Sequence, residues 1–326
     1  IYVDAVINHM VGSDRGAGYG IGGCWYNVST ESFPCVPYTA EDFNGPWDCP
    51  TGNQGIMNWD DPVQVRNCRL VGLLDLATTL ADTRTKIVGY LNKLIRYGVA
   101  GIRIDAAKHI WPDDLKAMMG MTEDLPTAHF PANSRMVTFQ EVIDWGNSPI
   151  SNAEYIGSGR LCLFCYGTEI SQAVRGGGGR SLAAFNLPGT NWGPPWLADQ
   201  ESMVFVDNHD TQRGSGNVLT YKDGKAYKMA VGFMLALPYG AARVMSSYYF
   251  TDNSQGPPHN ADYSTAHVPI NSDGSCGGGW VCEHRWPEVA HMAQFRWVTA
   301  GQPIVHWTTG GDGQVGFGRG NAGFYA

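Results

Sequence analysis

The chain has 326 residues, of which 43% are hydrophobic and 12% aromatic, enough to form a large folded core. Its formal net charge of −8 gives no reason to expect a nucleic acid or an anionic membrane as a partner. The sequence has no apolar run long enough to cross a bilayer, so we expect no membrane-spanning segment.

The cysteine content indicates the cellular compartment in which the protein folds. The eight cysteines form an even set, at positions 24, 35, 49, 68, 162, 165, 276 and 282. Asn27-Val28-Ser29 is a glycosylation sequon. Together these features favour an oxidising, secreted setting.

The N-terminal quarter of the chain contains one strand and one long irregular segment. Residues 1–7 are a β-branched apolar run that predicts a strand with Asn8 and His9 at its C-terminal end. Residues 10–76 are rich in Gly, Pro, Asn and Asp and show little periodicity, which is typical of a loop-rich excursion subdomain. A helix is expected over 83–97, capped by Asp82 or Thr83 and ended by Gly98, because apolar side chains recur at Ile87, Leu91, Leu94 and Ile95.

The rest of the chain alternates between strands and helices. Strands are expected at 99–105, 136–141, 160–166, 202–207 and 242–246, and helices at 112–119, from about 168, at 225–237 and at 287–298. Repeated strand–helix units with apolar strands predict a parallel sheet. Polar residues recur at the C-terminal ends of the strands, where a (β/α)8 barrel, the TIM barrel, has its active site. We therefore expect an α/β barrel with six of its strands, 3 to 8, present and the first two missing.

Gly101 to His109, GIRIDAAKH, is the most informative segment. Arg103 and Asp105 are two residues apart on a strand, so both side chains point to one face, and the cation favours an ionised carboxylate. Such a carboxylate is suited to act as a nucleophile. The other strand ends carry His9, Glu141, His209 and Asp210.

Convergent carboxylates indicate either glycoside cleavage or a divalent-metal hydrolase. The HxH spacing of many metal sites is absent around these acids, which favours sugar chemistry. Trp111, Trp145 and Trp192 either stack on sugar rings or pack in the core.

Four segments, in order, resemble the signature segments of the α-amylase family of glycoside hydrolases. They are DAVINH (Asp4 to His9), GIRIDAAKH, FQEV (Phe139 to Val142) and FVDNHD (Phe205 to Asp210), and GLLDLA (Gly72 to Ala77) resembles the subdomain segment of that family. Similarity to the animal members extends over almost the whole chain.

The resemblance implies a retaining endo-hydrolase of α-1,4-glucan bonds in starch, glycogen and maltooligosaccharides. It implies that Asp105 is the nucleophile, Glu141 the acid/base and Asp210 the third carboxylate. Burial of Glu141 would favour its protonated form. The implied substrate-binding residues are His9, Arg103, Lys108, His109 and His209.

The resemblance also implies two ions. Ca²⁺ would be bound by the side chains of Asn8 and Asp75 and by the backbone carbonyls of Arg66 and His109. Chloride would be bound by Arg103, Asn208 and Arg243, and would help to keep Glu141 protonated. We expect a secreted, extracellular digestive monomer.

By the same resemblance, residues 1–8 and 77–302 form the incomplete barrel, 9–76 the calcium-binding subdomain and 303–326 the start of a C-terminal β-sandwich. Cys49–Cys68 and Cys276–Cys282 match family disulfides. Cys24 pairs either with Cys35 or with a partner upstream, and Cys162 and Cys165 are either bridged across a bend or buried thiols.

The chain departs from the family in two places. The run after Asp210, TQRGSGNVLTYKDG, is shorter than in vertebrate members and has Ser215 near the place of a histidine. The chain starts on a core strand, so we expect a fragment that is inactive alone. The rival functions are a non-catalytic binding subunit, which would not need all three acids, and a transglycosylase or α-glucosidase.

Overall fold

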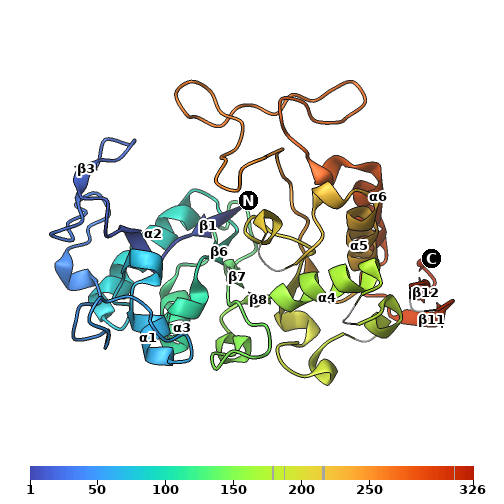
Figure 1. Ribbon diagram of the computed structural model, residues 1–326, viewed down its shortest axis with the longest axis horizontal. Helices are drawn as coiled ribbons and strands as arrows, with labels where there is room; N and C mark the ends of the chain where they lie inside the picture. The colour runs from blue at the N-terminus through green and yellow to red at the C-terminus, as the bar shows by residue number, and fades with distance from the viewer. Residues whose placement is uncertain (178–179, 187, 215–216, 312) are drawn as a thin grey trace. The chain divides into compact units, whose positions relative to one another are not determined.

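Four parallel strands form the sheet in the N-terminal half of the protein, as seen in its computed structural model (Figure 1). In spatial order they are β1 (Tyr2–Ala5), β6 (Gly101–Ile104), β7 (Val137–Gln140) and β8 (Arg160–Cys162). Every residue of β6 is buried, as expected for a parallel strand covered on both faces. The strands predicted at 1–7, 99–105 and 136–141 are confirmed, each shorter at both ends than predicted.

The structure describes residues 1–177, 180–186, 188–214, 217–311 and 313–326. These residues form two compact units, Ile1–Cys162 and Leu163–Ala326. Ser215 lies outside the described residues. No helix in the described ranges is both long and apolar enough to span a membrane. The expected domain boundaries at residues 9, 77 and 303 stay a prediction.

Helix α2 (Ala81–Arg96) is the longest helix of the first unit and packs against α3 (Pro112–Met121). It buries Ile87, Leu91 and Ile95, as their spacing predicts. Gly98, with φ +87°, follows the helix and ends it. The predicted N-cap is wrong, because the helix starts after Leu80 without a side-chain cap and Thr83 donates a hydrogen bond to Asp42 at 3.0 Å.

Residues 9–76 contain short elements held together by disulfides. Strand β2 (His9–Gly12) pairs with β5 (Leu73–Asp75), β3 (Ala17–Tyr19) pairs with β4 (Trp25–Asn27), and α1 (Pro62–Asn67) follows them. Cys24 is bonded to Cys35, which decides between the two alternatives for this cysteine. Cys49 is bonded to Cys68, as expected.

The second unit contains three helices and a parallel strand pair. Strand β9 (Ser202–Val204) pairs with β10 (Ala241–Ala242), and the helices are α4 (Phe164–Arg175), α5 (Lys225–Ala236) and α6 (Pro287–Val298). Helix α6 has the predicted bounds, since Pro287 starts it. Cys276 is bonded to Cys282, as expected.

Two predicted strands of the later chain have the wrong bounds. The expected strand 160–166 ends at Cys162, and α4 begins at Phe164. Residues 161–167 are all buried, so apolar periodicity cannot separate strand from helix there. The expected strand 242–246 is reduced to β10. Cys162 and Cys165 are buried thiols and do not belong to the three disulfides.

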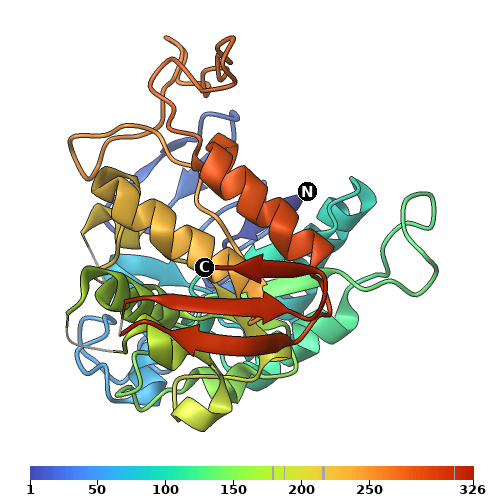
Figure 2. The same ribbon diagram turned by 90° about the vertical axis from the view of Figure 1, so that its right-hand side faces the viewer.

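The C-terminal segment forms a small antiparallel sheet, in the foreground of Figure 2. Its strands are β11 (Ile304–Thr309), β12 (Val315–Arg319) and β13 (Gly323–Tyr325). Arg319 is buried and donates hydrogen bonds to the carbonyls of Gln302, Ala236 and Thr299, which anchors the sheet to the helical part of the second unit.

Candidate active site

Arg103 is the centre of the candidate site in the first unit, and three carboxylates surround it. Its Nη1 donates to Asp105 Oδ1 at 2.6 Å and to Asp4 Oδ1 at 2.8 Å, and Glu141 Oε1 lies 2.7 Å from Nη2. Burial by itself would lower the pKa of Arg103, but the surrounding carboxylates outweigh burial and raise it. The guanidinium is therefore charged, and one cation faces three acids.

These acids come from the ends of adjacent strands. Asp4 lies in β1 directly opposite Arg103, Asp105 follows β6, and Glu141 follows β7. The prediction that Arg103 and Asp105 point to one face is confirmed by their contact. The contact between Arg103 and Asp4 was not predicted, although the parallel pairing of their strands is the signal that could have indicated it.

Glu141 is oriented by the turn that follows Asp105. The backbone N–H of Ala106 donates to Glu141 Oε2 at 2.8 Å, and the backbone N–H of Lys108 donates to the carbonyl of Glu141 at 3.2 Å. Ala106 has φ +49°, a left-handed conformation that is uncommon for a non-glycine residue. Such strained positions cluster at functional sites.

Nη2 of Arg103 is buried and makes no hydrogen bond of acceptable geometry, although Glu141 Oε1 is near it. Nη2 is therefore ion-paired with Glu141, but its N–H groups make no hydrogen bond, and a buried, positively charged N–H group in this state can bind a small anion. The residue therefore fits the expected chloride ligand.

His9 lies beside Asp105, with 3.9 Å between Nε2 and Oδ2. Burial lowers the pKa of His9, and the attraction of Asp105 opposes this only in part. The imidazole is therefore neutral at pH 7, with the Nδ2 amide of Asn8 3.3 Å from its Nδ1. A neutral histidine can donate one hydrogen bond and accept another.

Lys108 and His109 lie on the short 3-10 helix η3 (Ala107–His109). Lys108 Nζ donates to the carbonyl of Ile143 at 2.7 Å and to Ser148 Oγ at 2.9 Å, and burial lowers its pKa. His109 is buried and its Nδ1 lies 2.7 Å from the carbonyl of Val65. Burial lowers the pKa of His109 to about 4, so this ring is also neutral at pH 7.

Trp59 is a residue near the site that was not predicted from the sequence. Its ring is half exposed and lies edge-on against His109, with 6.0 Å between the ring centroids. The three tryptophans named from the sequence differ from it. Trp111 donates to Asn67 Oδ1 at 2.7 Å, and Trp192 packs between Arg180 and Trp196, so both are packing residues, whereas Trp145 is partly exposed.

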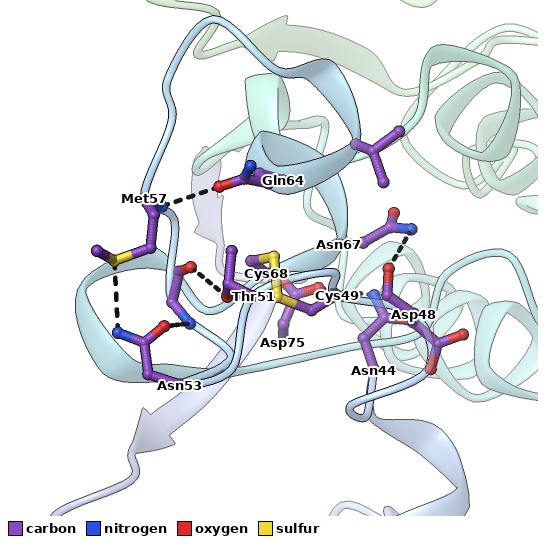
Figure 3. The surroundings of a disulfide bond; sticks show 12 residues. Asn44, Asp48, Cys49, Thr51, Asn53, Met57, Gln64, Asn67, Cys68 and Asp75 are labelled. Carbon is purple, nitrogen blue, oxygen red and sulfur yellow. Dashed lines mark hydrogen bonds between the residues drawn. A yellow bond between two sulfur atoms is a disulfide. The ribbon is translucent and has the colours of Figure 1, made fainter.

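Asp75 is the centre of the candidate calcium site, next to the Cys49–Cys68 disulfide (Figure 3). It is 1% exposed, and its carboxylate accepts from Asn44 Nδ2 at 2.7 Å and from Asn8 Nδ2 at 3.3 Å. Burial raises the pKa of Asp75 well above its usual range, and these two amides offset the shift only partly. The carboxylate has no salt-bridge partner within the described residues.

The carboxylate of Asp75 and the two asparagine amides are suitable ligands for a hard cation. Each asparagine amide can rotate to present its oxygen, and Ca²⁺ binds oxygen ligands. No group of three or more His, Cys, Asp and Glu side chains that could hold a metal exists in the described part of the chain. A cation at Asp75 would therefore need amide and backbone oxygens as well. Asn44 was not predicted, because it lies in an aperiodic loop.

The remaining candidate residues belong to the second unit. Asn208 Oδ1 accepts hydrogen bonds from the backbone N–H groups of Asp210 and Thr211, at 3.0 and 2.8 Å, and so shapes the segment after β9. His209 Nε2 lies 3.4 Å from Asp210 Oδ2, and both side chains are exposed. Arg243 is exposed, and its backbone N–H donates to the carbonyl of Val204.

No model of a protein family matches the sequence, but individual proteins do. The chain is 49% identical to an α-amylase of Oryzias latipes and 46% identical to the pancreatic α-amylase of Struthio camelus, in each case over 99% of its own length. It covers 65% and 67% of those two proteins, respectively. The chain thus spans about two thirds of the length of the curated relatives.

Solved structures agree with the sequence relatives. The crystal structure of α-amylase I from Eisenia fetida superposes with a TM-score of 0.93 at 40% identity, over 99% of this chain and 66% of that one. A mutant of the same enzyme has been solved as a complex with maltohexaose.

Proposed function

Because this chain belongs to the α-amylase family of glycoside hydrolases, we propose that it carries the catalytic machinery of an enzyme that cleaves internal α-1,4-glucosidic bonds in starch, glycogen and maltooligosaccharides. The observation that carries the proposal is the position of Arg103 between Asp105 and Glu141. Two carboxyl groups at the ends of neighbouring strands, joined by one buried cation, are suited to the two-acid chemistry of glycoside hydrolysis.

Asp105 is the proposed nucleophile. Its carboxylate attacks the anomeric carbon while Glu141 transfers its proton to the departing glycosidic oxygen, which leaves a glycosyl ester on Asp105. Glu141, now a carboxylate, takes a proton from a water molecule, which attacks the anomeric carbon and releases Asp105. The two displacements retain the configuration at the anomeric carbon. Asp210 is the proposed third carboxylate, which stabilises the positively charged transition state.

Polar side chains around these acids are suited to sugar hydroxyls. His9 is neutral at pH 7 and can donate to a hydroxyl of the ring that Asp105 attacks. Lys108, His109 and His209 are the further proposed substrate contacts. Arg103 acts by fixing Asp105 and Glu141.

Calcium would be held by the side chains of Asn8 and Asp75 with the backbone carbonyls of Arg66 and His109. The supporting observation is the burial of the Asp75 carboxylate among neutral amides. When bound, the cation would compensate this buried charge and tie strand β5 to the segment around Asn8.

Chloride would be held by Arg103, Asn208 and Arg243. The supporting observation is that Nη2 of Arg103 is buried and, although ion-paired with Glu141, makes no hydrogen bond of acceptable geometry. When bound, the anion adds negative charge beside Glu141 and so favours the protonated form that acid catalysis needs. The finer architecture, a complete barrel with a C-terminal β-sandwich, is likewise proposed. The disulfides of the chain support a secreted, extracellular protein.

The test is hydrolysis of amylose by the protein in the longest form that its transcript encodes. We expect a mixture of short maltooligosaccharides of α configuration, and Asp105→Asn and Glu141→Gln should each lose at least roughly a thousandfold in kcat. Glu123→Gln, which neutralises an exposed carboxylate of the same unit, is the matched control. Glucose as the sole product, longer chains than the substrate, or near-normal rates in Glu141→Gln would refute the proposal.

A further inference from the structure

A second candidate binding site lies in the second unit, in the segment between β10 and α6. Residues 250–280 of this segment form the long irregular excursion in orange in Figure 1. The excursion contains a pocket of about 550 Å³, which is within the usual size range of ligand sites. Its lining includes Tyr249, Gln255, Pro257, Pro258, His259 and Tyr263.

The aromatic rings of this pocket are available to a ligand. Tyr249 is 60% exposed and Tyr263 is 76% exposed. Tyr263 stacks on His259, with 5.1 Å between the ring centroids and 26° between the planes, and Tyr249 is held edge-on by Tyr221. Each of these two large exposed rings thus contacts an aromatic neighbour.

Tyr263 also has a backbone conformation that is unfavourable for a tyrosine. Its φ is +63°, in the left-handed region, where a bulky residue is an outlier. The turn is an N-x-D-x-S motif, Asn260 to Ser264, in which the N–H of Asn260 donates to the carbonyl of Ser264 and the N–H of Ser264 donates to Asp262 Oδ1.

The same motif occurs again from Asn271 to Ser275, with the same pattern of hydrogen bonds. In this second turn the position of Tyr263 is taken by Gly274, with φ +84°. Glycine is the residue that such a position favours. The first turn therefore has a strained tyrosine at the position where the second turn has an unstrained glycine. This difference indicates a functional role for the Tyr263 ring.

The chemistry of the lining indicates the class of ligand. No carboxylate, ammonium or guanidinium group lines the pocket, so neither an anion nor a cation is favoured. Aromatic faces with phenol and amide groups at their edges match a neutral ligand that has both apolar C–H faces and hydroxyl groups. A glucan chain has these properties, because each pyranose ring has an apolar face and a hydroxyl rim.

The pocket is connected to the segment that carries Asp210. Arg213, three residues after Asp210, donates from Nη1 to the carbonyls of Asn253 and Gln255, at 2.6 and 3.0 Å. Its guanidinium also lies over the ring of Phe250, 4.1 Å from the centroid. The wall of the pocket at Gln255 is thus anchored directly to the candidate active-site segment.

We propose that the pocket lined by Tyr249, His259 and Tyr263 is an accessory site that binds a segment of α-1,4-glucan by stacking on the two tyrosine rings. The choice of glucan rests on the proposed function. The site itself is defined by residues that have no part in the proposed cleavage.

Hydroxyl-radical footprinting of the protein tests the site directly. Oxidation of Tyr249 and Tyr263 is measured by mass spectrometry with and without maltoheptaose, and cellopentaose, a β-linked glucan, is the control ligand. Maltoheptaose should protect both tyrosines and cellopentaose should not. Absence of protection overturns the accessory site even if starch is hydrolysed, whereas protection without hydrolysis overturns only the proposed cleavage.

Variants separate a binding role from a structural one. Tyr263→Gly removes the ring and relieves the left-handed strain, so its Tm should be unchanged or higher, while retardation in glycogen-containing gels should weaken roughly fivefold, as for the loss of one ring contact. Tyr263→Trp should retain binding, and Tyr97→Ala, an exposed tyrosine of the first unit, should have no effect. All variants are made in a Glu141→Gln background to prevent digestion of the gel.

Normal retardation of Tyr263→Gly would overturn the proposal. If Tyr263→Gly instead lowers Tm by several degrees, the ring has a structural role, and the footprint of the unmodified protein alone decides the question.

Discussion

Asp4 contacts Nη1 of Arg103 with both carboxylate oxygens, at 2.8 and 3.0 Å. The two residues are directly opposite each other in the parallel pair β1 and β6. Asp4 is far more exposed than the guanidinium that it contacts, so its contribution to stability is reduced by solvent screening. Its effect should therefore appear in the geometry of the site, because the same Nη1 atom binds Asp105.

Replacement of Asp4 by Asn tests this positioning role. We expect kcat on soluble starch to fall roughly 10- to 100-fold, because Arg103 loses the anchor that fixes it beside Asp105. The KM should change little. The measurement is initial rates over a range of starch concentrations, with Asp14→Asn, an exposed carboxylate, as control. A rate within twofold of the unmodified protein would show that Arg103 is positioned without Asp4.

His109 should make the stability of the protein depend on pH. Burial lowers its folded pKa from 6.5 to about 4, so between these values the unfolded chain binds a proton that the folded protein does not. Stability should therefore be complete above pH 6.5 and should decrease as the pH falls from 6.5 towards 4, by up to roughly 3 kcal/mol.

Urea unfolding at pH 7 and pH 4.5 measures this effect. The difference in the free energy of unfolding between the two pH values should be smaller in His109→Asn, whose amide can replace the hydrogen bond to the carbonyl of Val65. The control is His129→Asn, because His129 is exposed. An unchanged pH difference in His109→Asn would mean that other groups cause it.

The parts of the fold that were predicted from the sequence are those with a local signal. Strands β6 and β7 are each followed directly by a carboxylate residue, Asp105 and Glu141, and α2 has a regular apolar stripe. The boundary between β8 and α4 was missed, because both elements are buried throughout.

The missed site residues have no local signal. Asn44 contacts Asp75 across 31 positions in the sequence, and Trp59 approaches His109 from the same aperiodic segment. Asp4 could be identified only after the pairing of β1 with β6 was known. Contacts between distant loops depend on the path of the chain, which propensity and spacing do not describe.

Lys86 should stabilise the subdomain by neutralising Asp42. Its Nζ lies 2.8 and 2.9 Å from the two carboxylate oxygens of Asp42, which is 1% exposed and also accepts from Thr83. In Lys86→Met the buried carboxylate would lose its cation, and we expect a loss of about 2 kcal/mol, less than for a fully buried pair because Lys86 is partly exposed.

Chemical unfolding of Lys86→Met measures this loss, and Lys93→Met on the exposed side of the same helix is the control. The double variant Asp42→Asn, Lys86→Met should be more stable than Lys86→Met alone, because it leaves no buried carboxylate without a cation. Equal stability of Lys86→Met and Lys93→Met would contradict the proposed role of the ion pair.

Replacement of Asp75 by Asn tests the proposed calcium site, because the direction of the change in Tm shows whether a cation is bound. A carboxylate that is 1% exposed among neutral amides destabilises the fold when it is charged and alone, so without a cation Asp75→Asn should raise the Tm. With a bound cation the same substitution removes a ligand and should lower the Tm, by an amount that grows with calcium concentration.

We expect the second result. Thermal unfolding is recorded in 1 mM calcium and again after chelation with EDTA, for the unmodified protein and for Asp75→Asn. Chelation should lower the Tm of the unmodified protein by about 5 °C or more and should leave that of Asp75→Asn unchanged. Asp48→Asn should respond to EDTA as the unmodified protein does, because Asp48, near the same disulfide, is exposed and accepts its hydrogen bonds from Gly45 and Asn67 (Figure 3). A higher Tm for Asp75→Asn, with no response of the unmodified protein to EDTA, would mean that the buried carboxylate is protonated and binds no cation.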